Sequence, residues 1–262
     1  MSKLVCLLPL LFSFLFIQNL VRPAESASAR VDVLANHSGY INDYGYFYVV
    51  GEVQNVGDEP VENVVVNATF YDLSGAFIAE IPGNTKLDVL LPGRKSPFEI
   101  TLFSSLDSQK VRNYTLSASY SQAQPKPLGL EIISNSSFKD ADGLHVTGEI
   151  KNIGSQFTSF VKVVATFYNE TGYVIAAKLN YSNPKNLDPG QSATFEILLD
   201  TSVRSNVYSY ALEAESMDYE MIPELNPASL LLIIVLATAI FTLQAKIKSN
   251  INHPPKKTCT RR

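Results

Sequence analysis

Cysteine is almost absent from this chain of 262 residues, which contains only Cys6 and Cys259, one near each end. The long stretch between them therefore cannot form an internal disulfide, and it cannot supply thiolate ligands to a zinc site. This central part must reach its stability through an apolar core alone.

Basic residues are scarce in the same central part. Residues 27–226, called the body below, hold 13 Lys and Arg against 24 Asp and Glu, a net charge of −11. A protein that binds nucleic acid needs a basic face to neutralise phosphates, so no nucleic-acid partner is expected. Residues 246–262 form a separate basic tail with six basic residues and no acidic one.

Two long apolar runs flank the body. The first covers residues 4–20 and follows Lys3, and Ala27-Ser28-Ala29 then offers a small-x-small cleavage site. This order predicts a secretory signal peptide over residues 1–29. The alternative is an uncleaved anchor, because an apolar run of seventeen residues is long for such a signal.

The second apolar run covers residues 225–245 and contains no charged residue. As a helix its 21 residues would extend about 32 Å, which matches a bilayer hydrocarbon core of about 30 Å. The basic tail that follows predicts a cytoplasmic C-terminus by the positive-inside rule. We therefore expect a single transmembrane helix at 225–245, a cytoplasmic tail at 246–262 and an extracellular body at the cell membrane.

The body repeats itself with a period of 97 residues. Residues 51–100 align without a gap to residues 148–197, with 19 identities in 50 positions, and "ATFYDLSG" at 68–75 returns as "ATFYNETG" at 165–172. We expect two copies of one unit, repeat 1 at 30–122 and repeat 2 at 128–220. The polar, proline-containing stretch 121–127 predicts a linker between them.

Apolar residues alternate with polar ones inside each copy, and no segment of the body shows a sustained helical period. The residues expected to face inward are Val64, Val66, Ala68, Phe70, Phe98, Ile100 and Leu102, with Val161, Val163, Ala165, Phe167, Phe195, Ile197 and Leu199 in the second copy. Lys162 and Thr166 fall on the opposite face of their strand. Several short alternating strands per copy predict an all-β fold of two tandem antiparallel β-sandwiches, Ig-like in architecture.

Each copy resembles the FxLYD domain family, small all-β modules of prokaryotic and especially archaeal surface proteins. The matching residues are Gly51, Glu52, Asn55, Gly57, Phe70, Tyr71, Asp72, Gly75, Pro92 and Gly93, and Gly148, Glu149, Asn152, Gly154, Phe167, Tyr168, Asn169, Gly172, Pro189 and Gly190. Ala68 and Ala165 stand where the name-giving Phe would be. The resemblance implies the fold and a surface location, and it implies no catalytic activity.

The segment before the second apolar run resembles the sorting signal of archaeal surface proteins in which a Pro-Glu-Phe-type motif precedes a hydrophobic span. Pro223 and Glu224 match this motif, whereas Leu225 and Asn226 replace the usual Phe-Gly. This resemblance leaves processing and re-anchoring of the C-terminus open as an alternative.

Three short polar segments are candidate binding sites. Residues 72–75 and 169–172 begin with Asp or Asn and end with Gly, a pattern typical of hairpin turns rather than of a ligand site. "DADG" at 140–143 looks like the start of a calcium loop, but the remaining ligands of such a loop are absent, which favours another turn.

No catalytic arrangement is recognisable. His37, His145 and His253 lie at non-equivalent positions, and neither a paired-carboxylate spacing nor a Gly-rich phosphate loop occurs. We therefore expect a protein that is not an enzyme, with no catalytic, cofactor-binding or metal-binding residue and no cofactor.

Two surface features remain. Six Asn-x-Ser/Thr triplets are possible glycosylation sites, or else the Asn and Thr content of polar strands: Asn36, Asn67, Asn113, Asn135, Asn169 and Asn180. An aromatic group could form a contact surface or flank a core: Tyr40, Tyr44, Tyr46, Phe47 and Tyr48.

These features together predict a membrane-anchored cell-surface protein with a structural, adhesive or protein-interaction role. Its partners would be the membrane and another surface protein, an envelope component or a glycan. The alternative is an extracytoplasmic solute- or metal-binding accessory subunit of a membrane complex, in which the acidic body would concentrate cations.

Overall fold

The computed structural model describes residues 28–200 and 206–223. This part of the chain is built almost entirely of antiparallel strands, which confirms the all-β prediction. None of its helices is long and apolar enough to cross a membrane. The predicted transmembrane helix and tail lie outside the described residues, as does the predicted signal peptide up to residue 27.

Ser28 and Ala29 contact repeat 1, since Ser28 N donates to Asp58 and Tyr120 donates to the Ala29 carbonyl.

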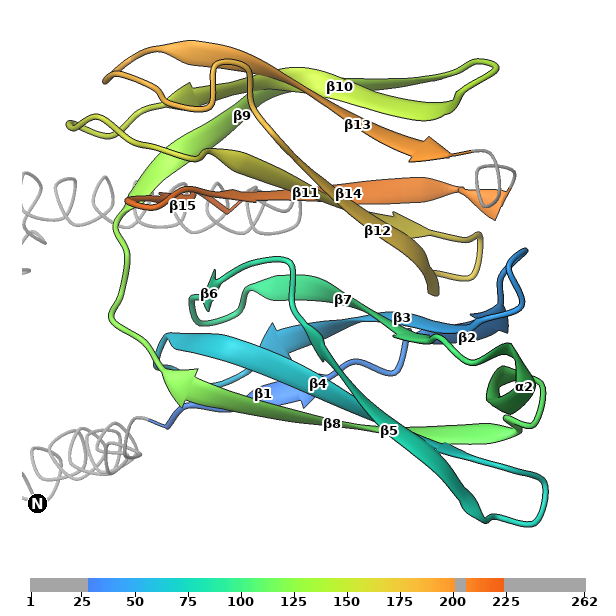
Figure 1. Cartoon of the computed structure of the whole chain (residues 1–262). Coiled ribbons are helices and arrows are strands. Elements are labelled where there is room, and N and C mark those ends of the chain that lie inside the picture. The colour runs from blue at the N-terminus through green and yellow to red at the C-terminus, as the bar shows by residue number, and fades with distance from the viewer. Residues whose placement is uncertain (1–27, 201–205, 224–262) are drawn as a thin grey trace, which may run out of the picture. The chain divides into compact units, whose positions relative to one another are not determined.

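Repeat 1 contains two four-stranded sheets (Figure 1). In one, β3 lies between β1 and β2 on one side and β7 on the other, and in the second, β4 pairs with β5, β6 and β8. The elements are β1 (Val31–Val33), β2 (Ser38–Ile41), β3 (Phe47–Asn55), β4 (Val61–Tyr71), β5 (Phe77–Asn84), β6 (Val89–Leu90), β7 (Lys95–Leu102), the helical turn α2 (Ser105–Ser108) and β8 (Asn113–Gln122).

The strands of repeat 2 correspond only in outline to those of repeat 1, because the single β9 stands in place of β1 and β2, β13 follows β12 directly, and β15 is added. They join into one seven-stranded sheet in the order β12-β11-β14-β15-β9-β10-β13. The strand β15 makes the join, because it pairs with β14 on one side and runs parallel to β9 on the other. The elements are β9 (Leu128–Lys139), β10 (Gly143–Asn152), β11 (Lys162–Tyr168), β12 (Val174–Tyr181), β13 (Ser192–Asp200), β14 (Ser209–Glu215) and β15 (Glu220–Met221).

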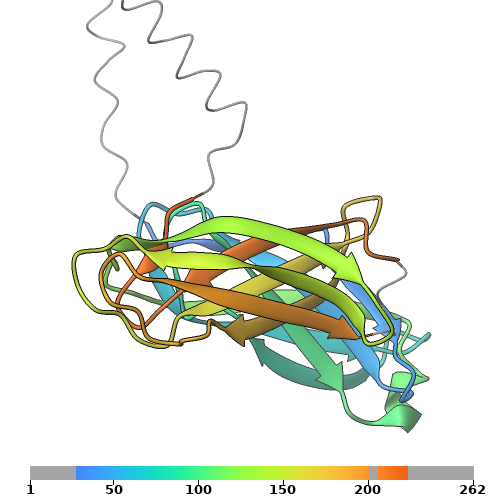
Figure 2. The ribbon, with the colours of Figure 1, turned by 90° about the horizontal axis from the view of Figure 1, so that it is seen from above.

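Each repeat has its own apolar core, formed by the residues that the alternating pattern predicted. All fourteen residues expected to face inward are buried, with Phe70, Phe98 and Phe167 among the largest fully buried side chains. Loops gather at the two ends of the strands, and Figure 2 shows β10 and β13 lying in front of repeat 1 when the molecule is viewed from above. The residues through Met221 form one compact unit.

The second face of β11 differs from the prediction. The alternation places Lys162 and Thr166 on an outward face, yet both are buried, and so is Val164 between them. Repeat 1 covers this face, and Val164 belongs to the core cluster of repeat 1. At the equivalent place in repeat 1 stands Asn67, which is only half-buried.

The repeated Gly-Glu-x-x-Asn-x-Gly segment has a structural role in both copies. The side chain of Asn152 is fully buried, and its Nδ2 donates to the carbonyls of Gln156 and Leu187 at 2.8 and 3.0 Å. Its Oδ1 accepts from Gly154 N at 2.9 Å. Asn55 makes the same three bonds in repeat 1. This amide therefore holds the loop after the central strand and needs no ligand to explain its recurrence.

We expect Asn152→Ala to lower the free energy of unfolding by about 2–4 kcal/mol, because it removes the three hydrogen bonds of a fully buried amide side chain. Thermal unfolding followed by circular dichroism measures this change. The matched control is Asn84→Ala at an exposed position of β5, which should change stability by less than about 0.5 kcal/mol. Equal effects of the two substitutions would contradict this role for Asn152.

Candidate interaction surfaces

The two repeats meet across an apolar contact. Val50 of β3 packs with Val174 and Ala177 of β12, and three half-buried tyrosines surround them: Tyr40, Tyr48 and Tyr168. The Tyr40 hydroxyl donates to the Ile175 carbonyl at 3.2 Å. Burial, followed by the charge of Glu99, raises the pKa of Tyr40 to about 12, so this hydroxyl stays protonated as a donor. The contact therefore combines apolar packing with directed hydrogen bonds.

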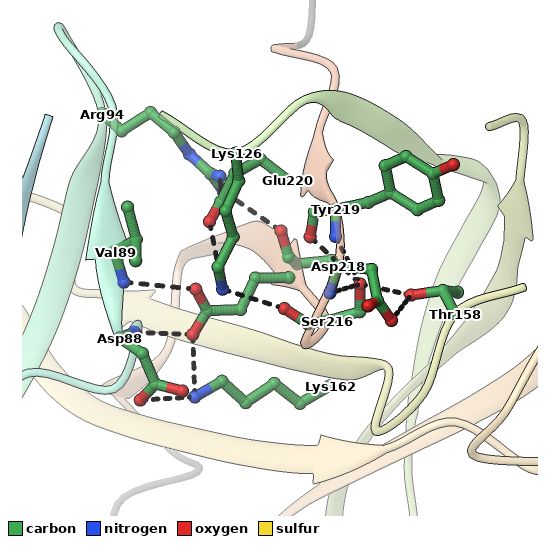
Figure 3. Close-up of polar contacts among 12 residues, drawn as sticks. Asp88, Val89, Arg94, Lys126, Thr158, Lys162, Ser216, Asp218, Tyr219 and Glu220 are labelled. Atoms are coloured by element: carbon green, nitrogen blue, oxygen red, sulfur yellow. Dashed lines mark hydrogen bonds and ion pairs between the residues drawn. The ribbon is translucent and has the colours of Figure 1, made fainter. Parts of the chain in front are cut away.

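A buried network of charged residues also joins the two repeats (Figure 3). Arg94 of repeat 1 is almost fully buried and reaches into repeat 2, where it pairs with Glu213 and Glu220 and donates to the Ala214 carbonyl at 3.2 Å. The position equivalent to Arg94 in repeat 2 is Gln191, so the second copy lacks this cation. The Arg94 guanidinium therefore joins the two repeats through a contact for which repeat 2 has no equivalent residue.

A second part of the network is centred on the carboxylate of Glu215, which is 1% exposed. It accepts from the backbone amides of Asp88 and Val89 in repeat 1, at 2.6 and 3.3 Å. Lys162 Nζ lies 2.8 Å from Glu215 Oε1 and 3.0 Å from Asp88 Oδ1. Burial alone would lower the pKa of Lys162, but these carboxylates raise it, and the ammonium stays charged.

Glu220 has the most unusual environment in this network. One of its oxygens pairs with Arg94, while its buried Oε1 has no hydrogen-bond partner within the described part of the chain and lies 3.8 Å from Lys126 Nζ. Burial raises the pKa of Glu220 to about 8, opposed by the Arg94 charge and reinforced by the nearby Glu215. A raised pKa means that the folded protein binds this proton more tightly than the unfolded chain does.

Stability should therefore depend on pH through Glu220. Its protonation contributes stability that is fully present below its unfolded pKa of 4.5 and is lost as pH rises towards 8. We expect Glu220→Gln to flatten the fall in the free energy of unfolding across that range by a few kcal/mol. Melting temperatures from pH 4.5 to 8.5 test this, with Glu131→Gln at an exposed position of β9 as control. A variant that keeps the wild-type slope would contradict the assignment.

A further polar contact between the repeats involves Glu52, which is buried. Its Oε1 accepts from the Tyr168 hydroxyl at 2.7 Å, and its Oε2 accepts from Asn36 Nδ2 at 2.9 Å. Burial and then the charge of Glu52 raise the pKa of Tyr168 far above its ordinary value. The equivalent Glu149 in repeat 2 is exposed, so the repeated Glu has this role in one copy only.

Exposed apolar side chains gather on the loops at the end of the strands opposite the linker. Phe103 and Tyr46 are in ring contact at 5.6 Å, Phe47 N donates to Ser108 at 2.8 Å, and Arg112 N donates to the Tyr71 carbonyl at 2.9 Å. These contacts hold the loop before β3, α2 and the turn after β4 together. We call the most exposed apolar residues here the tip: Tyr44, Leu73, Phe103 and Leu106 from repeat 1 and Tyr208 from repeat 2, each more than 70% exposed.

The aromatic group at residues 40–48 is thus divided among three places. Tyr40 and Tyr48 lie in the contact between the repeats, with ring centroids 5.8 Å apart. Phe47 packs on the core of repeat 1, and only Tyr44 projects freely. Phe47 therefore flanks a core, Tyr40 and Tyr48 pack between the repeats, and a contact of this group with an outside partner stays a prediction.

Two concave regions accompany these surfaces. A cleft of about 530 Å³ opens beside the contact between the repeats, and its lining includes Tyr40, Tyr48, Glu99 and Lys178. A shallow groove of about 580 Å³ on repeat 2 is lined mainly by hydroxyl, amide and carboxylate side chains, among them Thr147, Glu149 and Asn180.

The polar segments singled out in the sequence are turns. Asp72 Oδ1 accepts from the amides of Ser74 and Ala76, and Asn169 Oδ1 accepts from those of Thr171 and Tyr173. Asp140 does the same for the amides of Asp142 and Gly143, at 2.9 and 3.2 Å. Within the described residues, no three His, Cys, Asp or Glu side chains are grouped as a metal site would require.

One cluster could not be found from the sequence. His145 Nδ1 lies 2.5 Å from Glu196 and Nε2 lies 3.0 Å from Asp140, while the imidazole stacks on Phe138 at 4.6 Å. The hydrogen bond to Glu196 raises the pKa of His145, burial opposes this, and the bond to Asp140 adds to it. The carboxylates of Glu196 and Asp140 thus hold the His145 imidazole between β13 and the 140–143 turn. His37 has a different environment and is bonded to Tyr114 at 2.8 Å.

The possible glycosylation sites differ in accessibility. Asn113, Asn135 and Asn180 are exposed, and Asn36, Asn67 and Asn169 are half-buried. Asn180 Nδ2 donates to the Glu196 carbonyl at 2.9 Å, and Asn36 Nδ2 is bonded to buried Glu52. Because a glycan is attached to Nδ2, glycosylation of Asn36 or Asn180 would disturb a hydrogen bond that this nitrogen donates.

If the chain is glycosylated, we expect Asn113 and Asn135 to carry glycans and Asn36 to remain unmodified, because its side chain lies between the repeats. Mass spectrometry of glycopeptides from the native protein measures the occupancy of each site. High occupancy at Asn36 in the folded protein would contradict the contact between Asn36 and Glu52.

Comparison with protein-family models gives no match. Among curated proteins, the chain is 34% identical over 96 residues to "Uncharacterized protein MJ0360" of Methanocaldococcus jannaschii, and the alignment covers 36% of this chain and 67% of that protein. This chain belongs to the family of MJ0360. The aligned length is close to one repeat period, and the name of MJ0360 states no activity or ligand.

Two solved structures show only remote similarity. A red sea bream transglutaminase gives a TM-score of 0.24 at 9% identity, covering 78% of this chain and 31% of that one. A calcium-binding mutant of Bacteroides uniformis beta-glucuronidase 2 gives 0.22 at 10% identity, covering 70% and 28%. The chain spans less than a third of either protein, and similarity at this level supports no functional statement.

Proposed function

We propose that this MJ0360-family chain is a single-pass membrane protein of the cell surface, with a body of two FxLYD-type, Ig-like β-sandwiches that acts through non-catalytic contact with a partner. The observation that carries the proposal is the buried contact between the repeats. Arg94, Glu215 and Glu220 hold the two halves in one arrangement, as a spacer or recognition arm requires. The apolar runs before and after the body supply the targeting and the anchor.

The tip is the surface best suited to meet such a partner. Its five residues come from separate loops and are exposed, so folding does not account for their apolar character. Exposed apolar groups that gather in one region are typical of protein–protein contacts, and loops on a rigid scaffold commonly form them. We propose another surface protein or an envelope component as the partner.

The membrane topology can be tested with the native Cys259 and an introduced cysteine. We expect a membrane-impermeant maleimide to label Leu73→Cys in intact cells, because Leu73 is 86% exposed on the extracellular body. Cys259 should become labelled only after the cells are permeabilised. Labelling of Cys259 in intact cells would contradict the proposed orientation.

The role of the tip can be tested by substitution and cross-linking. A photo-reactive residue at Leu106 should form a defined adduct with a surface component, and one at Thr115 on the exposed side of β8 should not. The pair Leu73→Asp and Phe103→Asp should abolish the adduct at Leu106 without changing the melting temperature, since both side chains are mainly exposed. An adduct that persists in this double variant would place the interaction elsewhere.

A further inference from the structure

Comparison of the two repeats singles out a group of residues that only repeat 2 possesses. At four equivalent positions repeat 1 has Pro60, Asn63, Asn84 and Asp88, whereas repeat 2 has Phe157, Phe160, Tyr181 and Lys185. We call the latter four the aromatic cluster. Since the longer strands recur in both copies, the shared fold does not require three aromatic rings and a lysine at these places.

Three members of the cluster lie close together, and Phe157 lies on the same loop as Phe160. The Phe160 and Tyr181 rings are in edge contact with centroids 6.4 Å apart, and Lys185 Nζ lies 5.2 Å from the centroid of the Tyr181 ring. Phe157 and Phe160 are 53% and 54% exposed, so these rings are largely unburied. Rings that contribute little to a core in the described fold are available for contact with something outside it.

The backbone of Phe160 strengthens this argument. Its φ is +53°, and the equivalent Asn63 has the same value. Asparagine tolerates this left-handed conformation, whereas a bulky residue adopts it at a cost. Repeat 1 thus carries the residue type that suits the conformation, and repeat 2 carries a strained, exposed phenylalanine. Strain at an exposed side chain points to a function for that side chain.

The cluster lies at the end of repeat 2 from which the chain continues towards the predicted transmembrane helix. The loop that carries Phe157 and Phe160 packs on the turn after β14, because Met217 N donates to the Ser159 carbonyl at 3.0 Å. The amide of Ile153, at the start of the same loop, donates to the Gly129 carbonyl at 2.9 Å, next to the pairing of Leu130 with Met221.

The chain between this point and the predicted helix is short. Met221 ends β15, and the predicted helix begins at Leu225, four residues later. Four residues extend at most about 14 Å. The end of repeat 2 that carries the cluster must therefore lie close to the membrane surface if the helix spans it, while loops at the other end of the strands are free of this restraint.

We infer that the aromatic cluster lies in the headgroup region of the membrane that anchors the chain. Tyrosine is enriched at this depth, phenylalanine can bury its ring at the boundary between headgroups and acyl chains, and a lysine can place its stem beside them while its ammonium remains in water. Exposed Met217 adds apolar surface at the same end. This contact sets the orientation of the body on the membrane, and it rests on the anchoring proposed above.

The chain contains no tryptophan, which allows a direct test. We would prepare the full chain with Phe157→Trp, Phe160→Trp, Phe103→Trp at the tip or Leu236→Trp within the predicted helix, each as a single reporter. Each is reconstituted into phosphatidylcholine vesicles with and without bromine-labelled lipid. We expect roughly twofold quenching at positions 157 and 160, strong quenching at 236 and none at 103.

The outcomes separate the two proposals. If Trp at 236 is quenched while those at 157 and 160 behave like that at 103, the membrane contact is wrong and the anchor stands. If Trp at 236 is not quenched, the anchoring itself fails. A blue-shifted but unquenched signal at 157 would indicate contact between two copies of the chain and would overturn the lipid contact.

A second variant distinguishes a membrane role from a structural one. Phe160→Asn restores the residue of repeat 1, so we expect an unchanged or higher melting temperature, because Asn suits the positive φ. Added to the Phe157→Trp reporter, it should reduce quenching by the labelled lipid. A lower melting temperature with unchanged quenching would show that Phe160 serves the fold and not the membrane contact.

Discussion

The carboxylate of Glu215 is the constraint on which the arrangement of the two repeats depends. It is buried, it accepts hydrogen bonds from two backbone amides of repeat 1, and it pairs with Lys162, so removing the Lys162 ammonium would leave a buried carboxylate without its counter-ion. Such a loss typically costs about 3–5 kcal/mol. Arg94 and Glu220 form a second buried ion pair between the repeats, and the apolar contact around Val50 adds packing between them. Two similar halves are thereby joined into one compact unit.

Much of the fold could be predicted from local pattern. The alternation around Val66 and Phe167 identified the core faces, and the recurring Asp72 and Asn169 segments identified turns. These predictions succeeded because alternation and turn chemistry depend on neighbours within a few residues. The predicted targeting and membrane segments lie outside the described residues and stay predictions.

The contact between the repeats could not be predicted, because its partners are far apart in the sequence. Arg94 and Glu220 are separated by 126 positions, and Asp88 and Glu215 by 127. No local pattern links such residues. The alternation predicted an outward-facing Lys162, which is buried, because repeat 1 covers the second face of this strand. One usable signal existed, since Val164 replaces Asn67 at a place where repeat 1 covers repeat 2.

The sequence differences between the two repeats also affect how many repeats of this kind can stack. Repeat 1 receives its neighbour on the face of Tyr48 and Val50, and repeat 2 docks through the opposite side of its fold, at β11 and β12. A contact of this head-to-tail kind is open-ended by symmetry and could continue into a filament. The residues equivalent to Tyr48, Val50 and Val164 of this contact are His145, Thr147 and Asn67. A further copy at either end would have to bury these polar groups, which disfavours extension of the pair into a longer array.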